Sequence, residues 1–465
     1  MIRLNAAEGL EISMPALNDI LSLFPSGPEL SVTLSKTESG VCAFAGSVRT
    51  EVSMRENSTA KTAKLALYDL MTALTGEKKA WGTMTGVKPL KKYQSLYLQG
   101  MTEPQADRFF SDNYRISPEK LSLLKEIFRL QMPYLSAEKD SVCLYINIPL
   151  CPAKCTYCSF PTLTVSEGDS RCSVYLDVLI SELKCLSEFI KNNEMKVRAV
   201  YFGGGTPSVF NLSQTEKLFL SVSEHIGKQT EVTFEAGRAD TLSEEKLHLI
   251  KDLGANRISL NPQTANDTTL IHAGRNIPFS EFLSVYESAY KAGFDNINCD
   301  LIFGFENENT DDFSDSLRKT MSLGPGSITL HTLCKKHASQ LDMQAISSAG
   351  QDVASYLNQA RTVLRGAGYS PYYSYKQKYA VSGGENTGYC LSGHECIYNI
   401  YMMNDRCDIL AAGAGSSSKL IGAGTKTYHI YNPKDYLLYT NSPQEIISKK
   451  MKSLNDALRD RLSRD

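Results

Sequence analysis

The chain has 465 residues, of which 42% are hydrophobic and 22% are charged, and its formal net charge is −2. This composition is that of an ordinary globular protein with two or three domains of about 100–200 residues each. A charge so close to zero gives no general affinity for nucleic acid or for an anionic membrane, so we expect neither as a partner.

No segment of the sequence is typical of secretion or of membrane insertion. The first residues, MIRLNAAEGLEIS, lack the apolar stretch of a signal peptide. No run approaches the ~18 apolar residues of a membrane span. We therefore expect a cytoplasmic location, in which the 12 cysteines are reduced thiols or metal ligands rather than a disulfide framework.

Residues 1–137 are expected to form an N-terminal α+β domain of unknown role. Apolar and polar side chains alternate between residues 31 and 51, as they do in half-buried strands, and helical patterns follow at 58–74 and 117–130. We find no catalytic constellation in this segment.

Residues 138–337 combine short β-branched and aromatic runs with amphipathic helical stretches. We expect strands at 142–148, 197–202, 231–235, 257–260, 297–302 and 327–331, and helices at 174–191, 214–226, 244–253, 280–292 and 310–322. This alternation predicts βαβ units and a parallel sheet. Six strands are too few for a complete eight-fold barrel. The predicted fold is therefore α/β, a partial (β/α)6 barrel with its chemistry at the carboxyl ends of the strands.

Residues 338–465 are expected to form a mixed, mainly helical C-terminal region. Helical patterns cover 351–365 and 445–465, and the stretch 369–379 is rich in tyrosine.

Three cysteines follow the first expected strand of the barrel at the spacing Cys-x3-Cys-x2-Cys, namely Cys151, Cys155 and Cys158. Three thiolates cannot close a structural zinc site, which needs four ligands. They suit a cubane iron–sulfur cluster in which three irons are held by thiolate and the fourth stays open. Chance clustering, or a zinc site that borrows a distant ligand such as His394, remains an alternative.

With Tyr157 in its aromatic position, this spacing resembles the signature of the radical S-adenosylmethionine (radical SAM) superfamily. The resemblance implies a [4Fe-4S] cluster on the three cysteines, with SAM bound to the open iron. It also implies that one electron from the cluster splits SAM into methionine and a 5′-deoxyadenosyl radical. In such enzymes the cofactors carry the difficult chemistry and the protein positions and shields them.

Further elements of the superfamily stand in the expected order at the ends of successive strands. The sequence from 203 to 207 is similar to the GGGTP element, which holds the SAM amino group in the family, although a tight turn would explain the glycines as well. By resemblance, Gln263 meets the ribose, Arg275 the SAM carboxylate, and Asp300 the ribose or adenine side. Taken singly, such residues are also common as helix caps or surface charges. The SAM contacts that the resemblance implies are Tyr145, Tyr157, Gly204, Gly205, Thr206, Glu235, Gln263, Arg275 and Asp300.

Three stretches resemble the oxygen-independent coproporphyrinogen III oxidase (dehydrogenase)-like group, and most closely its HemZ branch. They are the YINIP sequence at 145–149, the Gly-rich loop at 410–419, and the pair formed by 81–89 with 376–389. The implied reaction is the oxidative decarboxylation of coproporphyrinogen III to protoporphyrinogen IX in haem biosynthesis, with a flavodoxin- or ferredoxin-type electron donor. Cationic side chains are expected around the tetrapyrrole carboxylates. Lys335, Lys336 and Lys376 are candidates by position, and solvated surface lysines are the alternative for each.

The sequence also departs from that group. Phe160 stands where its better-established dehydrogenases carry a further cysteine, and Phe305 and Glu306 replace a Leu-Pro pair. One alternative is a haem chaperone of the same family, with an iron ligand among His331, His337 and His394. Another is a different radical SAM reaction on a tetrapyrrole. A second cluster on Cys390, Cys396 and Cys407 is also conceivable, with structural thiols as the alternative.

Overall fold

The computed structural model describes the chain except for residues 1–2, 7–9, 11, 25–30, 55–57, 87, 136–139, 229, 335–352, 378–379, 381–382, 423–425 and 464–465. The chain divides into two units, and each combines stretches that are separate in sequence. The first consists of residues 1–129, 352–358 and 375–385, and the second of 130–351, 359–374 and 386–465. The functional division of the chain at residues 137 and 337 stays a prediction.

The first unit has a four-stranded sheet in the order β1-β2-β3-β4, in which β1 and β2 are parallel and the other neighbours antiparallel. Apolar residues of the sheet pack against α1 and α2 to form a core of its own that includes Leu34, Val41 and Leu67. The elements are β1 (Arg3–Ala6), α1 (Met14–Leu21), β2 (Ser31–Lys36), β3 (Gly40–Ala45), β4 (Val48–Ser53), α2 (Thr59–Thr75), α3 (Pro89–Leu98), α4 (Glu103–Tyr114) and α5 (Pro118–Gln131).

The second unit contains an eleven-stranded sheet in the order β13-β14-β12-β11-β10-β9-β8-β5-β15-β16-β17. Its six central strands are parallel to one another, which confirms the predicted partial (β/α)6 barrel. These strands are β5 (Ser141–Ile148), β8 (Lys196–Gly204), β9 (Glu231–Glu235), β10 (Arg257–Ser259), β11 (Ile297–Phe303) and β12 (Ser327–Thr332).

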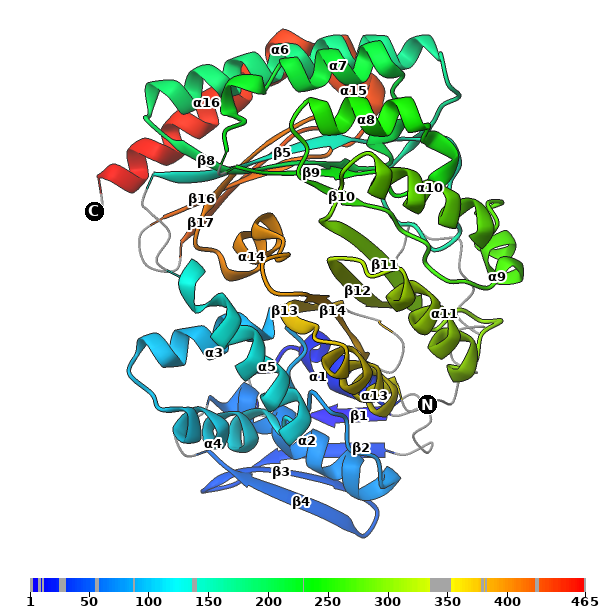
Figure 1. Ribbon diagram of the computed structural model, residues 1–465. Helices are drawn as coiled ribbons and strands as arrows, with labels where there is room; N and C mark the ends of the chain where they lie inside the picture. The colour runs from blue at the N-terminus through cyan, green and yellow to red at the C-terminus, as the bar shows by residue number, and fades with distance from the viewer. Residues whose placement is uncertain are drawn as a thin grey trace. The chain divides into compact units, whose positions relative to one another are not determined.

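Amphipathic helices between these strands cover the outer face of the curved sheet (Figure 1). Their apolar faces meet the sheet in one core, in which Leu179, Phe202 and Phe234 are fully buried. Short polar residues begin several of these helices; Asn211, for example, caps α7 through a reciprocal pair of hydrogen bonds with Gln214. The helices are α6 (Ser170–Asn192), α7 (Leu212–Leu220), α8 (Glu244–Asp252), α9 (Asp267–His272), α10 (Phe279–Lys291) and α11 (Thr310–Ser322).

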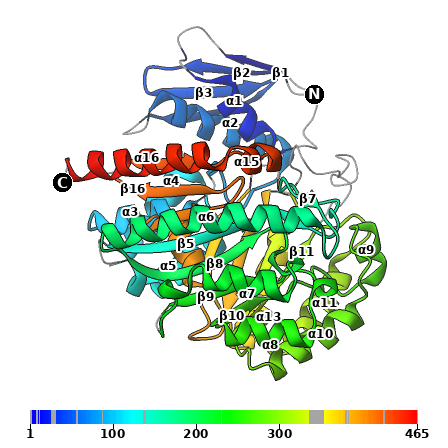
Figure 2. The ribbon, with the colours of Figure 1, turned by 90° about the horizontal axis from the view of Figure 1, so that it is seen from above.

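The C-terminal part of the chain is mixed, as expected, and it extends the sheet at both edges. Strand β15 is added in parallel beside β5, and β14 is added antiparallel beside β12. Helix α14 lies on the inner side of the curved sheet, and α16 runs alongside α6 on its outer face (Figures 1 and 2). The elements are α13 (Val353–Gly366), β13 (Ser370–Lys376), β14 (Glu385–Cys390), α14 (Ile397–Asn404), β15 (Asp408–Ala412), β16 (Ser417–Ile421), β17 (Thr427–Tyr431), α15 (Tyr436–Asn441) and α16 (Pro443–Leu462).

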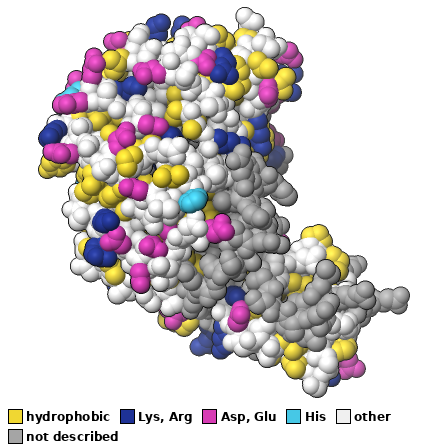
Figure 3. All heavy atoms as spheres, turned by 90° about the vertical axis from the view of Figure 1, so that its right-hand side faces the viewer, with side chains coloured by type: hydrophobic (Ala, Val, Ile, Leu, Met, Phe, Trp, Pro, Cys, Tyr) yellow, Lys and Arg dark blue, Asp and Glu magenta, His cyan; other side chains and the backbone are white. Residues whose placement is uncertain are grey.

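In the part of the chain that is described, no helix is both long and apolar enough to cross a lipid bilayer. On the face shown in Figure 3, cationic and anionic side chains are interspersed over the described residues. This mixture matches the net charge of −2 of the whole sequence.

Candidate active site

The cysteine loop leaves the sheet at the carboxyl end of β5. Its first part, β6 (Leu150–Cys151), pairs in parallel with the short β7 (Leu163–Thr164) that closes the loop. The amide of Leu163 donates to Pro149 O at 2.8 Å and that of Val165 to Cys151 O at 2.9 Å. The two ends of the loop are therefore held together by main-chain hydrogen bonds. Cys151 is buried, whereas Cys155 and Cys158 are half-buried.

The glycine element after β8 packs directly against this loop. The amides of Gly205 and Thr206 donate to Ile148 O and Leu150 O, each at 2.8 Å, and the Thr206 hydroxyl lies 3.3 Å from Cys151 Sγ. A Cβ atom on Gly205 would lie 2.6 Å from Leu150 O and 2.9 Å from Cys151 Sγ, distances that real Cβ atoms do not show. Glycine is thus required here for a close backbone approach, and not only for a turn.

A second segment holds the middle of the cysteine loop. The Arg275 guanidinium donates to the Tyr157 hydroxyl at 3.2 Å and to Gly237 O, and the Thr156 amide donates to Ala273 O at 3.1 Å. Gly274 has φ +73°, and a Cβ there would lie 3.2 Å from Lys154 O. The predicted residues Tyr157 and Arg275 are therefore in contact.

Arg238 is a further residue of this site, which no sequence motif indicates. It is buried, its Nη1 lies 3.7 Å from Cys155 Sγ, and it donates two hydrogen bonds of 3.0 and 2.7 Å to Asp240. Burial opposes its charge, but the Asp240 carboxylate outweighs burial and raises the pKa of Arg238, so the guanidinium is charged. Its position just after β9, at the edge where the carboxyl ends of parallel strands meet, is the feature of the sequence that could have indicated it.

Glu235, at the end of β9, lies beside the glycine element. It accepts a hydrogen bond of 3.3 Å from the Gly204 amide. Burial, together with the nearby Asp300 carboxylate, raises the pKa of Glu235 to about 8. This carboxyl group therefore keeps its proton near neutral pH in the absence of a bound cation.

Gln263 and Asp300 lie side by side after β10 and on β11. The Gln263 amide donates to Asp300 O at 2.9 Å. Gln263 has φ +67°, and its Oε1 is buried with no hydrogen-bond partner among the described residues. A buried acceptor and a strained backbone at one residue are typical of a place where a ligand binds.

The Asp300 carboxylate stays ionised in this setting. It accepts a hydrogen bond of 2.8 Å from Asn298, and His331 Nε2 lies 3.6 Å from its Oδ2. Burial alone would raise the pKa of Asp300, but His331 and the hydrogen bonds from Asn298 and Thr329 outweigh burial and lower it. Asp300 and Glu235 are therefore two carboxyl groups in one site with opposite shifts in pKa.

Tyr145, on β5, connects the barrel to the glycine-rich C-terminal loop. Its hydroxyl donates to Asn147 Oδ1 at 3.1 Å, and Asn147 Nδ2 donates to Ala414 O at 2.5 Å. A Cβ on Gly413 would lie 2.2 Å from Asn147 O. The Gly-rich loop at 410–419 therefore packs against the end of β5.

These residues fit a cubane cluster better than a single metal ion. Among the described residues, no group of three or more His, Cys, Asp or Glu side chains is arranged to hold one ion. In a cubane each thiolate binds its own iron, so the sulfur atoms need not converge on one point. His394 packs against Gly326, before the start of β12, whereas the cysteine loop follows the carboxyl end of β5. The structure therefore contradicts a zinc site that borrows His394.

The contacts of the C-terminal cysteines favour structural thiols over a second cluster. Cys407 Sγ lies 3.8 Å from that of Cys143, and Cys396 donates to the Glu231 carboxylate at 3.4 Å. Cys390 is buried as well.

Lys376 is not a surface lysine. It is buried in the first unit, where its ammonium donates to Met84 O at 2.6 Å and lies 5.3 Å from the centre of the Trp81 ring. Burial lowers the pKa of Lys376 to about 8. Lys335, Lys336 and His337 lie outside the described residues.

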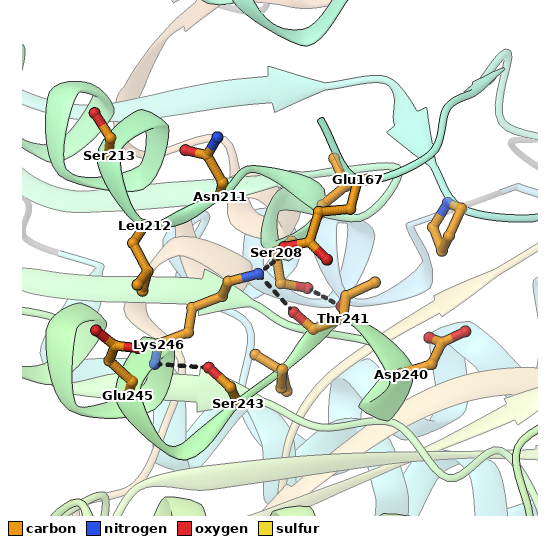
Figure 4. A pocket seen from close by; sticks show the side chains of 13 residues that line it. Glu167, Ser208, Asn211, Leu212, Ser213, Asp240, Thr241, Ser243, Glu245 and Lys246 are labelled. Atoms are coloured by element: carbon orange, nitrogen blue, oxygen red, sulfur yellow. Dashed lines mark hydrogen bonds between the residues drawn. The ribbon is translucent and has the colours of Figure 1, made fainter. Parts of the chain in front are cut away.

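A pocket of about 570 Å³ opens next to the cysteine loop. Pro152, which follows Cys151, lines it together with Glu167 and Asp240, the partner of Arg238. Figure 4 shows the side chains of Glu167 and Asp240. The Lys246 ammonium is engaged by the main chain of the pocket wall, because it donates to Ser208 O and Thr241 O, both at 2.9 Å. Of the Arg238–Asp240 pair, Asp240 is therefore the member that lies at the protein surface.

Comparison with known proteins agrees with this geometry. The family model described as the radical SAM superfamily matches residues 145–320. The oxygen-independent coproporphyrinogen-III oxidase-like protein HemZ of Bacillus subtilis is 36% identical over 84% of this chain and 80% of its own length. The haem chaperone HemW of Haemophilus influenzae is 28% identical over 63% of this chain and 75% of its own length.

Among solved structures, the coproporphyrinogen III oxidase HemN of Escherichia coli, a radical SAM enzyme, matches with a TM-score of 0.52. The match covers 68% of this chain and 72% of that one at 19% sequence identity. At that identity the likeness shows a shared fold.

Proposed function

Because the chain belongs to the radical SAM superfamily, in the HemZ branch of the oxygen-independent coproporphyrinogen III oxidase-like group, we propose that it oxidatively decarboxylates coproporphyrinogen III to protoporphyrinogen IX. The observation that carries this proposal is the 36% identity with HemZ over 84% of the chain, which extends well beyond the 145–320 match.

The superfamily's cofactors are a [4Fe-4S] cluster and SAM, which together supply a one-electron cleavage of SAM and a radical able to take a hydrogen atom. We assign the cluster to Cys151, Cys155 and Cys158. The thiol of Cys151 is buried, and neighbouring thiols add to the effect of burial, so its pKa is raised to about 11. Metal binding must therefore displace its proton.

The polar residues around the loop are suited to the charged end of SAM. Gly204 and Gly205 let the end of β8 pack closely against Asn147 and the cysteine loop, and Arg275 offers a planar cation to a carboxylate. An ammonium placed beside Glu235 would lower its pKa from about 8 and release its proton.

After β10 and on β11, Gln263 Oε1 and the ionised Asp300 offer acceptors for hydroxyl groups of a ribose.

The proposed reaction converts two propionate side chains of the substrate, each in the same way. The β-carbon loses a hydrogen atom, and the resulting carbon radical then loses one electron and CO2, which leaves a vinyl group. The substrate therefore needs an acceptor for one electron per vinyl group formed. We further propose that a flavodoxin- or ferredoxin-type protein supplies the electron that each cleavage of SAM requires.

A haem chaperone is the second candidate, and one observation favours it. Phe160 follows the third cysteine in place of a further cysteine, and its side chain is 55% exposed. HemW, which is named a haem chaperone, is 28% identical over 63% of the chain. Of the histidines considered as haem ligands, His331 is placed beside Asp300.

Turnover separates the two candidates. The protein is reconstituted without oxygen, SAM, dithionite and coproporphyrinogen III are added, and 5′-deoxyadenosine and porphyrins are followed by chromatography. Protoporphyrinogen with about two deoxyadenosines per product supports the proposal. Deoxyadenosine without any change in the porphyrinogen contradicts the proposed substrate, and retention of haem without cleavage of SAM favours the chaperone.

Cys155→Ala is the inactive variant for this assay. Cys185→Ala is its matched control, because Cys185 is also half-buried but lies on α6.

A further inference from the structure

The Arg238 side chain links a cysteine of the loop to the surface of the protein. Its Nη1 lies 3.7 Å from Cys155 Sγ, and its Nε and Nη2 donate to the two carboxylate oxygens of Asp240 at 3.0 and 2.7 Å. The Arg238 side chain is only 7% exposed, whereas that of Asp240 is 32% exposed and lines the pocket beside the loop.

This arrangement fixes a cation against a sulfur atom. Because both oxygens of Asp240 are used, the guanidinium plane is held in one orientation, with its remaining nitrogen directed to Cys155. A positive charge and an N–H donor at a thiolate sulfur stabilise the more negative, reduced form of an iron–sulfur cluster. The carboxylate of Asp240 offsets part of that charge.

We propose that Arg238 is a positioning residue that raises the reduction potential of the cluster held by Cys151, Cys155 and Cys158, and that Asp240 holds Arg238 in place while limiting this effect. The inference rests on the cluster assignment of the proposed function. It requires no particular tetrapyrrole substrate. The step concerned is the uptake of one electron, in which no bond is formed or broken.

The proposal predicts opposite shifts for the two partners. Arg238→Gln removes the cation and leaves the Asp240 carboxylate near the sulfur, so reduction becomes less favourable. We expect a change of about tenfold in the equilibrium constant of one-electron reduction, which corresponds to a potential about 59 mV more negative. Asp240→Asn keeps the cation and removes its counter-charge, so the potential becomes more positive. Arg238→Lys keeps the charge and stays closer to the wild type than Arg238→Gln does.

The test is a redox titration of the reconstituted full-length protein with dithionite, in which the reduced cluster is followed by electron paramagnetic resonance. Arg115→Gln is the matched control, because Arg115 donates to both oxygens of Asp69 at 3.0 and 2.8 Å in the first unit. The reduction potential of the cluster in Arg115→Gln should equal that in the wild type.

The proposal would be overturned if the cluster had the same reduction potential in Arg238→Gln as in the wild type. It would also be overturned if Arg238→Gln and Asp240→Asn shifted the potential in the same direction. If Arg238→Gln takes up no cluster, the sign of the Asp240→Asn shift decides instead. A wild-type protein that holds a reducible cluster but does not cleave SAM contradicts the proposed function and leaves this titration valid.

Discussion

The main-chain amide of Gly204 donates a hydrogen bond of 3.3 Å to the carboxyl group of Glu235, which joins the glycine-rich end of β8 to the end of β9. A Cβ on the preceding Gly203 would lie 2.7 Å from the same carboxyl oxygen. The wall of the candidate site is therefore built from main-chain atoms and one acidic side chain, and its charge depends on whether that side chain is protonated.

Glu235→Gln should change how the stability of the metal-free protein depends on pH. The folded-state pKa of Glu235 is about 8, above the ordinary value of 4.5. Its contribution to stability is therefore fully present below pH 4.5 and is lost as the pH rises toward 8, by at most about 1.4 kcal/mol per pH unit. Glutamine does not titrate, so the variant gains stability relative to the wild type over this range. Urea unfolding at several pH values measures the difference, and parallel profiles would argue against a raised pKa.

Gly205→Ala should weaken both cluster binding and the fold. The added Cβ would meet Leu150 O and Cys151 Sγ at less than 3.0 Å, so the cysteine loop must move. We expect a loss of about 1–3 kcal/mol in stability and a lower iron content after reconstitution. Gly366→Ala is the matched control, because a Cβ there meets nothing within 4 Å. Full iron content in Gly205→Ala would disprove the close packing of these two segments.

Arg275→Lys should reduce the affinity for SAM. A lysine keeps the charge but loses the planar fork that pairs with a carboxylate, and hydrogen bonds to charged groups are worth about 1.5–3 kcal/mol. We therefore expect the dissociation constant to rise by about ten- to a hundredfold. Equilibrium dialysis with the reconstituted protein measures it, with Arg115→Lys as the control. An unchanged constant would mean that Arg275 serves only to hold Tyr157 and Gly237.

Lys450→Met should strongly destabilise the second unit. Lys450 and Glu182 form a fully buried pair at 2.5 Å, and Glu182 also accepts hydrogen bonds from the Tyr439 hydroxyl and the Gly413 amide. Removal of the lysine leaves a buried carboxylate without its cation, which costs about 3–5 kcal/mol. Thermal or urea unfolding tests this, and Lys449→Met, on the exposed side of the same helix, should unfold like the wild type.

The six parallel strands of the barrel could be predicted because each is a short run of β-branched and aromatic residues between amphipathic helices. The expected bounds 231–235 and 327–331 agree with β9 (Glu231–Glu235) and β12 (Ser327–Thr332) to within one residue. Helix α9 (Asp267–His272) was missed because six residues are too few to show a helical period. Strands β15 and β14 were missed because their partners, β5 and β12, are distant in the sequence.

The residues of the site could be predicted only where they belong to a recognisable sequence motif. The cysteine spacing indicated the loop, and the order of elements indicated Arg275. The contact between Arg238 and Cys155 joins residues 83 positions apart and depends on how the loop folds back over the ends of the strands. Lys376 was expected to face solvent or substrate, but the Trp81 ring and Met84 O enclose its ammonium. Hydropathy alone does not reveal a buried lysine whose charge is satisfied by the main chain.

The most direct test of the proposed reaction is a labelling experiment on the hydrogen that leaves the substrate. Coproporphyrinogen III deuterated at the β-carbons of its propionates is incubated with the reconstituted protein, SAM and reductant, and 5′-deoxyadenosine is analysed by mass spectrometry. The proposed function predicts that deoxyadenosine gains deuterium while vinyl groups appear on the tetrapyrrole. Deoxyadenosine that carries no deuterium, formed while the propionates stay intact, would contradict the proposed function.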